Sequence, residues 1–202
     1  VRTHAGGSHF TAHLPDGTHL PVSLSLPGQH NVHNALAAAV CAWVLGIGAE
    51  QIAFGLSEAR PVRGRMRELA GIAGSRIIDD SYNANPASAK AALEYLAQLD
   101  GTRVFVLGDM GELGHEAAEL HREVGESARS KCDRLIAVGP LAAAAASAFG
   151  PEAEVFDDIT DVADALLASL DEQTTVLIKA SRSMRFERLA AALAQPAGDA
   201  SC

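Results

Sequence analysis

The sequence predicts an α/β protein whose larger part is a mostly parallel sheet with helices on both faces. Three observations support this fold class. Beyond residue 65, short apolar runs of strand length alternate with longer runs of helical period. Before residue 65 the pattern is different, with an alternating hairpin followed by helices. The chain has 202 residues, of which 48% are hydrophobic, and this is enough to bury a sizeable core.

The first part of the chain predicts a hairpin and two helices. Residues 9–15 and 18–27 alternate polar with apolar side chains around a DGT turn, which is typical of a half-buried hairpin. Apolar residues then recur at helical spacing over 31–45, and a shorter helical run covers 50–56. The segment EARPVRGR, residues 58–65, breaks both periods with proline and glycine, so we expect an interdomain hinge there.

Beyond the hinge, strands and helices alternate. We expect strands at 75–79, 103–108, 134–139 and 175–180, and helices at 86–99, 115–130, 141–149, 161–170 and 184–193. Asn85 followed by Pro86 is a typical N-cap and first-turn pair. Such alternation predicts a Rossmann-like, mostly parallel sheet, in which ligands bind at the carboxyl ends of the strands. We therefore expect two domains, 1–64 and 65–202.

Charge and composition limit the classes of partner. The net charge is −9, and it falls on residues 65–202, because residues 1–64 hold three acids and three bases. An acidic protein with three lysines is a poor partner for nucleic acid, which requires clustered lysine and arginine. The longest apolar stretch is too short to span a bilayer, and no secretion signal opens the chain, so we expect a cytoplasmic protein. We also expect a monomer.

Cysteines and histidines do not predict a metal site. Cys41, Cys132 and Cys202 are far apart and form no CxxC pair. His9 and His13 would share one face of a strand, but no cysteine or carboxylate set accompanies them. We expect no metal ligands in this chain.

Several segments carry polar residues in patterns that indicate ligand binding. They are LPGQHNVHNALAAA (26–39), VRGRM (62–66), IIDDSYNANPASAKAAL (77–93), VLGDMGELG (106–114) and LIKASRSMRFE (177–187). An asparagine amide offers the donor and the acceptor that an adenine edge requires, and a guanidinium binds phosphate oxygens in pairs. The GxxGxxG spacing in the fourth segment is not the dinucleotide pattern GxGxxG, so we expect no dinucleotide cofactor.

Together these segments resemble the Mur ligase family over nearly the whole chain. The first is similar to the HNxxNALAA motif at the end of the family's central ATPase domain, and DSYNANP with GDMGELG resembles the branch that adds D-alanyl-D-alanine. The resemblance implies that 1–64 is the tail of a P-loop ATPase domain, here a hairpin plus helices, and that 65–202 is the C-terminal, glutamate ligase-like domain. It implies an ATP-dependent amide ligase that joins D-alanyl-D-alanine to UDP-MurNAc-tripeptide in peptidoglycan biosynthesis, through an acyl phosphate and with ATP and Mg²⁺.

The resemblance also implies roles for individual residues. The ATP-binding positions are Asn31, Asn34, Arg65, Asp80, Tyr82, Asn83 and Asn85, and the substrate-binding positions are Asp109, Lys179, Ser181 and Arg182. Three of these have a plainer alternative. Asn31 would cap its helix, Arg65 would be a solvated linker residue, and Lys179 would pair with Asp80 or Asp109 across the sheet edge. Ala180 stands where the family's KGSR segment has glycine.

The chain contains no Gly-Lys pair, so the P-loop GxxxxGK(S/T) is absent from it. The metal-binding and carbamoylated residues of the family also precede the matched region. We therefore expect a fragment that is inactive alone.

Two rival functions remain open. A signalling receiver domain would also have an acid pair after one strand, as at Asp79 and Asp80, a phosphoacceptor aspartate after another, as at Asp109, and a lysine after the last, as at Lys179. In such a domain, however, a further strand and helix lie between the acid pair and the phosphoacceptor. A sister ligase such as a folylpolyglutamate synthase fits DSYNANP and GDMGELG less well.

Overall fold

The computed structural model describes residues 1–4, 7–26, 28–60 and 62–196. The chain divides into two compact units, Val1–Pro61 and Val62–Cys202, and the division falls within the predicted hinge. Each unit has its own hydrophobic core. Pro27, Pro61 and Cys202, which belong to segments or sets considered above, lie outside the described residues.

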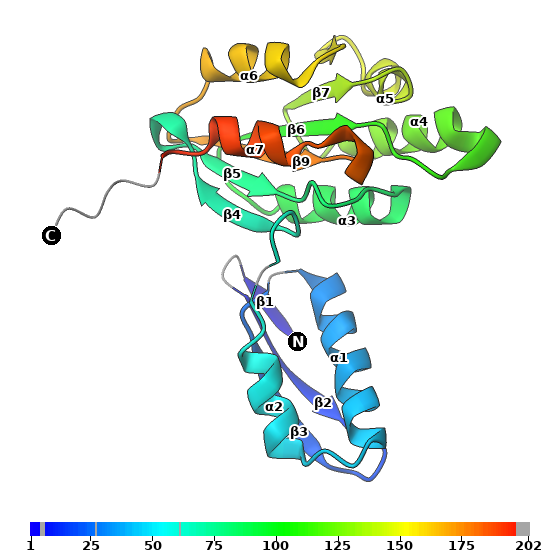
Figure 1. Cartoon of the computed structure of the whole chain (residues 1–202), viewed down its shortest axis with the longest axis vertical. Helices are drawn as coiled ribbons and strands as arrows, with labels where there is room; N and C mark the ends of the chain where they lie inside the picture. The colour runs from blue at the N-terminus through cyan, green and yellow to red at the C-terminus, as the bar shows by residue number, and fades with distance from the viewer. Residues whose placement is uncertain (5–6, 27, 61, 197–202) are drawn as a thin grey trace, which may run out of the picture. The chain divides into compact units, whose positions relative to one another are not determined.

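The first unit is an antiparallel sheet with helices on one face (Figure 1). Its strands are β1 (Arg2–His4), β2 (Gly7–His13) and β3 (His19–Leu24), paired in that order, and its helices are α1 (Gln29–Val44) and α2 (Ala49–Ser57). The predicted hairpin is β2–β3, which pairs from Ser8 with Leu24 to His13 with His19. Alternate residues of both strands are buried against α1 and α2, as the sequence pattern requires.

Helix α1 begins earlier than the periodicity suggested. Its first residue is Gln29 and its N-cap is Gly28, so the interpretation of Asn31 as the helix cap is wrong. At its other end, the indole N–H of Trp43 donates to the Asp16 carboxylate at 2.9 Å. This bond fastens the hairpin turn to the helix.

In the described part of the second unit, six strands form one sheet in the order β4-β5-β9-β6-β7-β8. The strands are β4 (Arg67–Ala70), β5 (Arg76–Asp79), β6 (Thr102–Gly108), β7 (Arg134–Val138), β8 (Ala153–Phe156) and β9 (Thr174–Lys179). Strand β4 is antiparallel to β5, and the other neighbours are parallel. The predicted mostly parallel α/β fold is thus confirmed. Strands β4 and β8, which form the two edges, were not predicted.

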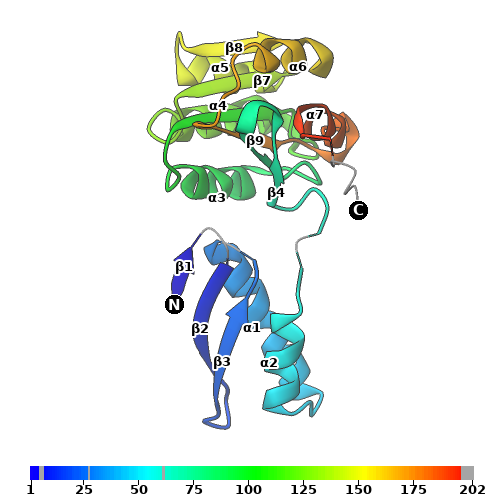
Figure 2. The same cartoon turned by 90° about the vertical axis from the view of Figure 1, so that its left-hand side faces the viewer.

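Helices cover both faces of this sheet (Figures 1 and 2). One face packs against α3 (Pro86–Leu96), α4 (Ala117–Ala128) and α5 (Ala142–Phe149), and the other against α6 (Ile159–Leu167) and α7 (Glu187–Leu193). Successive residues of the central strands alternate between the two cores, so that Phe105 faces the α3–α4 side and Val106 faces the α6–α7 side. Short 3-10 turns lie at Ile72–Gly74, Gly114–Glu116 and Arg182–Met184.

The carboxyl ends of the parallel strands β5, β9, β6 and β7 lie side by side, and ligands of such folds bind there. We call this row of carboxyl ends the sheet edge; it is distinct from the two outer strands β4 and β8. The residues that follow these ends are Asp80, Ala180, Asp109 and Gly139. This edge carries most of the predicted site.

Candidate functional site

Two arginine side chains lie over the ring of Tyr82. The guanidinium carbon of Arg65 is 4.3 Å from the ring centroid, and that of Arg182 is 5.7 Å from it. The three residues come from the hinge before β4, the loop after β5 and the loop after β9, and all three are exposed. The ring face attracts cations, so it holds both guanidinium groups near one position. Paired guanidinium groups suit a phosphate or carboxylate ligand.

Arg65 and Arg182 differ in their other contacts. Within the described ranges Arg65 forms no ion pair with a carboxylate. Arg182 lies 3.7 Å from a carboxylate oxygen of Glu187, and 65% of its side chain is exposed. Both cations are therefore accessible to an anionic ligand.

Asp80 and Lys179 form a buried ion pair at adjacent strand ends. The Lys179 Nζ is 2.6 Å from Asp80 Oδ2, with 2% and 14% of the two side chains exposed. Lys179 also donates to the carbonyl of Asn83 at 3.0 Å. The other Asp80 oxygen accepts the backbone N–H of Met66 at 3.1 Å, directly after Arg65. The geometry favours the pairing alternative for Lys179, and Asp80 holds the end of the hinge in place.

The loop after β5 is held by a hydrogen bond to the hinge and by hydrogen bonds of its own asparagines. The N–H of Tyr82 donates to the carbonyl of Gly64 at 2.9 Å, which joins this loop to the hinge. The amide oxygen of Asn83 accepts the N–H of Ala84 at 2.9 Å. Asn85 caps helix α3, accepting the N–H of Ser88 at 2.8 Å, and this confirms the predicted N-cap. The oxygens of both asparagine side chains are thus bonded to local backbone.

Asp109 caps a helix that begins 33 residues later in the chain. Its Oδ1 accepts the N–H of Leu141 at 3.0 Å and that of Ala142 at 2.7 Å, at the start of α5. Gly139 allows this approach, because a Cβ there would lie 2.7 Å from the Asp109 carboxylate and its φ of +103° favours glycine. Asp109 therefore has a structural partner in addition to its predicted contact with substrate.

Two buried groups near the site were not singled out from the sequence. Met66 has a left-handed backbone with φ of 49°, and His121 is fully buried in α4. A histidine on the apolar side of a helical pattern is the one signal that could have revealed His121. Nothing in the pattern around residue 66 indicated a left-handed residue.

Asn31 and Asn34 belong to the first unit, and the other nine predicted residues to the second. Both asparagines lie in the first two turns of α1, where Asn34 is exposed and Asn31 is half-buried.

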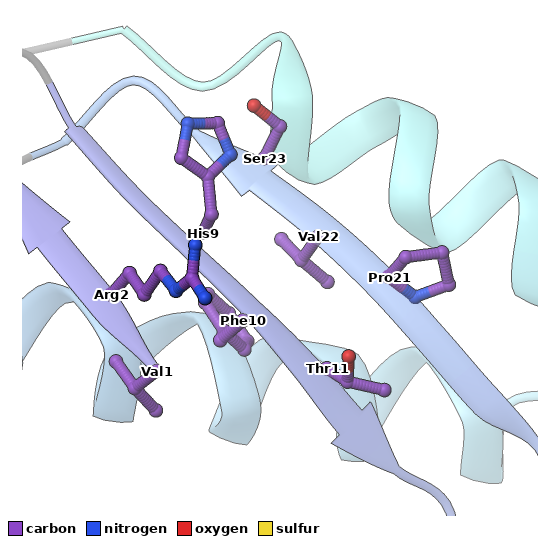
Figure 3. Close-up of a pocket in the computed structure, with 8 residues that line it drawn as sticks. All are labelled: Val1, Arg2, His9, Phe10, Thr11, Pro21, Val22 and Ser23. Carbon is purple, nitrogen blue, oxygen red and sulfur yellow. The ribbon is translucent and has the colours of Figure 1, made fainter.

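A shallow pocket of about 470 Å³ lies on the first unit, lined by residues of β1, β2 and β3 (Figure 3). Arg2, His9 and Ser23 are among its lining residues. It contains none of the predicted site residues.

The described part of the chain holds no metal-ligand cluster, and its buried thiol is not activated. No group of three His, Cys, Asp or Glu residues there is arranged to hold a metal ion. Burial raises the pKa of the Cys132 thiol to about 12, so it stays protonated near neutral pH. Among the described helices, none combines the length and apolar character needed to cross a bilayer.

Comparison with known proteins decides the family. Residues 64–182, more than half of the chain, match the family described as Mur ligase, glutamate ligase domain. The chain belongs to the Mur ligase family.

Two relatives of this Mur ligase chain carry the same curated name. It is 40% identical over 190 residues to the UDP-N-acetylmuramoyl-tripeptide--D-alanyl-D-alanine ligase of Escherichia coli K12, covering 93% of this chain and 42% of the relative. It is 31% identical over 210 residues to the ligase of the same name from Bacillus subtilis 168, covering 94% of this chain and 46% of the relative. The chain thus spans less than half the length of these relatives.

Solved structures agree with this Mur ligase assignment. MurF from Acinetobacter baumannii matches 94% of this chain and 42% of its own, with a TM-score of 0.84 and 33% identity. MurF ligase from Thermotoga maritima, solved in complex with ADP, matches 94% of this chain and 43% of its own, with a TM-score of 0.80 and 27% identity.

The receiver-domain alternative finds no support in this Mur ligase fold. Strand β9 lies between β5 and β6, so Lys179 separates the strand ends that carry Asp80 and Asp109. The Asp109 carboxylate caps α5, and Asp80 is paired with Lys179.

Proposed function

We propose that this chain is the C-terminal part of an ATP-dependent ligase that joins D-alanyl-D-alanine to UDP-MurNAc-tripeptide. Residues 1–64 are the tail of its ATPase domain, and residues 65–202 are its C-terminal domain. The observation that carries the proposal is the contact of Arg65 and Arg182 with Tyr82, because it unites three of the Mur ligase motifs at one sheet edge. The names of the relatives support the choice of substrates.

The residues of this edge fit a nucleotide. ATP combines a flat base with a chain of phosphates, and the edge offers an aromatic ring beside the permanent cation of Arg65. Arg65 binds the phosphates or the ribose, and Tyr82 shapes the nucleotide side of the site. Asp80 acts mainly through the hinge, because its oxygens bind Met66 and Lys179. We assign Asn31 and Asn34 of α1 to recognition of the adenine base edge. ATP supplies the phosphoryl group that activates the tripeptide carboxylate.

The dipeptide requires a cation. D-alanyl-D-alanine carries one carboxylate that must be held while its amine reacts, and residues 65–202 carry the whole net charge of −9. Arg182 provides a local positive charge on a loop that Ser181 and Asp109 hold through a backbone bond of 3.1 Å. We therefore assign the carboxylate to Arg182.

No residue of this chain is assigned to Mg²⁺, since no described group has the ligand set of a metal site. The metal would be held by the part of the relatives that this chain does not span. The reaction consumes ATP and a UDP-linked precursor, so we place it in the cytoplasm.

A phosphate-release assay tests the proposal. The full-length protein that carries this chain is supplied with ATP and UDP-MurNAc-tripeptide, with and without D-alanyl-D-alanine. We expect release that depends on the dipeptide, and none from the 202-residue chain, which lacks a P-loop. ATP-dependent release by the chain alone, abolished by Asp80→Ala, would falsify the fragment assignment. Labelling of Asp109 by acetyl phosphate would favour a receiver instead.

A further inference from the structure

Three consecutive residues of the loop between β6 and α4 are each bonded to a different element. Asp109 accepts two N–H groups from the start of α5. The N–H of Met110 donates to Nε2 of His121 in α4 at 2.8 Å. The N–H of Gly111 donates to Oγ of Ser181, in the loop after β9, at 2.5 Å. The loop is therefore fixed from three sides.

Both ring nitrogens of His121 have partners, and these partners define its tautomer. Nδ1 is 2.6 Å from the carbonyl oxygen of Ala117, which only accepts, so Nδ1 carries the hydrogen. Nε2 faces the N–H of Met110, which only donates, so Nε2 is bare. His121 and Met110 are both fully buried. An apolar residue at 121 would leave the N–H of Met110 buried without an acceptor.

Two hydrogen bonds connect the loop to Ser181, which lies beside the site. The N–H of Ser181 donates to the carbonyl of Asp109 at 3.1 Å, while its Oγ accepts from Gly111. Ser181 directly precedes Arg182, whose guanidinium lies over Tyr82.

The loop backbone contains conformations that its surroundings must hold. Glu112 and Gly114 both adopt left-handed conformations, with φ of 61° and 64°. For a residue with a Cβ such as Glu112, this conformation is unfavourable unless its surroundings impose it.

We propose that His121 is a positioning residue for the ligase reaction: through Met110 it sets the loop 109–114, and through Ser181 it sets Arg182 where the dipeptide carboxylate binds. This inference rests on the proposed function. His121 touches no substrate, because its ring is fully buried and its two nitrogens are bonded within the protein.

Steady-state kinetics of the full-length ligase test the proposal. In His121→Leu we expect the KM for D-alanyl-D-alanine to rise about tenfold or more, with the KM for ATP within about twofold, because a small misplacement of a binding group has a large kinetic effect. His121→Gln retains an oxygen acceptor for Met110 and should restore most of the loss. His115→Ala, an exposed histidine at the end of the same loop, is the control and should change neither KM.

A dipeptide KM that stays at the wild-type value in a folded His121→Leu enzyme overturns the proposal. If His121→Leu does not fold, His121→Asn, whose shorter side chain reaches the N–H of Met110 less well, is combined with Ser181→Ala. The combined effect on the dipeptide KM should not exceed that of the stronger single variant, and effects that multiply contradict a shared route.

Hydrogen exchange separates this proposal from the proposed function. In the 202-residue chain, His121→Leu should speed exchange of the Gly111 and Ser181 amides about tenfold or more, and His115→Ala should not. Unchanged amides in His121→Leu contradict the positioning role. A wild-type enzyme without dipeptide-dependent turnover contradicts the proposed function alone.

Discussion

Single residues at the sheet edge divide into those that bind one another and those that remain available. Lys179, Asp80 and Asp109 are bonded to protein groups at distances of 2.6 to 3.1 Å. Arg65 and Arg182 contact an aromatic ring and are exposed. The edge therefore combines a fixed frame with accessible cations, which is the arrangement that binding of an anionic ligand requires.

A buried and an exposed ion pair of the second unit should differ in how much they contribute to the free energy of unfolding. Lys179→Ala should lower the free energy of unfolding by about 3–5 kcal/mol, because it leaves the largely buried Asp80 carboxylate without its cation. Lys90→Ala is the matched control: Lys90 pairs with Glu123 at 2.8 Å, but 40% and 41% of the two side chains are exposed. It should cost about 1 kcal/mol or less. Urea denaturation measures both, and equal losses would contradict the structural role of the buried pair.

At the scale of elements, the helices on one face of the sheet pack at very close range. A Cβ built on Gly125 of α4 would overlap the backbone carbonyl of Ala145 in α5. Backbone cannot move aside as a flexible side chain does, so glycine is required at this crossing.

Gly125→Ala should therefore destabilise the second unit by about 1–3 kcal/mol, although alanine is the better helix former. Gly55 of α2 is the control, because a Cβ there meets nothing within 4 Å. Gly55→Ala should not lower the stability of the 202-residue chain, because alanine is the better helix former and no atom opposes its Cβ. Thermal unfolding of each variant gives the two values. A neutral Gly125→Ala would show that α4 and α5 separate easily.

An ion pair joins strands β6 and β7 at their amino-terminal ends, and it predicts that the free energy of unfolding depends on pH. The Arg103 guanidinium donates to the Asp133 carboxylate at 2.9 and 3.1 Å, and this lowers the pKa of Asp133 below its ordinary value. A lowered folded-state pKa stabilises the protein above the unfolded pKa of about 3.9, and this stabilisation disappears as the pH falls through the folded pKa. The pair is partly exposed, so the effect should be small.

Unfolding free energies measured between pH 6 and pH 3 should therefore fall less steeply in Asp133→Asn than in the wild type. A slope in Asp133→Asn identical to the wild type contradicts the assignment.

At the scale of the whole molecule, the sequence predicted the interior of the fold better than its edges. The central strands are continuous apolar runs, such as RVFVLG for β6, because both of their faces are buried. The edge strands β4 and β8 read RELA and AEVF and have no fully buried residue, so their sequences lack that pattern. The predicted helix limits differed from the observed ones by a few residues, because capping by Gly28 or by the distant Asp109 leaves little trace in the apolar periodicity.

The sequence identified residues of the site, but it did not show which of them contact one another. Motif positions identified Arg65, Tyr82 and Arg182, but their contact joins segments 17 to 117 residues apart. The ion pair of Asp80 with Lys179 spans 99 residues. Such contacts are set by strand order, and the insertion of β9 between β5 and β6 cannot be read from local pattern.

The division into two units predicts separate folding behaviour. Both cores of the second unit lie within residues 62–202, whereas the first unit has a small core of its own. Its exposed apolar side chains include Val44, Leu45 and Phe54, with 70%, 79% and 69% exposed. Expressed separately, the second unit should melt cooperatively and the first should not. Calorimetry of both pieces checks this, and the reverse result would overturn the domain boundary.

In the proposed function, the arginine and tyrosine cluster binds the anionic groups of the ligase substrates, with Arg182 on the dipeptide. The most direct measurement is the pair of KM values of Arg182→Ala in the full-length enzyme, with Arg188→Ala, an exposed arginine of α7, as control. Loss of a charged hydrogen bond costs about 1.5–3 kcal/mol, so the KM for D-alanyl-D-alanine should rise by about one to two decades. The KM for ATP should change far less, and Arg188→Ala should change neither value. If only the KM for ATP rises, or if only the melting temperature falls, the claim is contradicted.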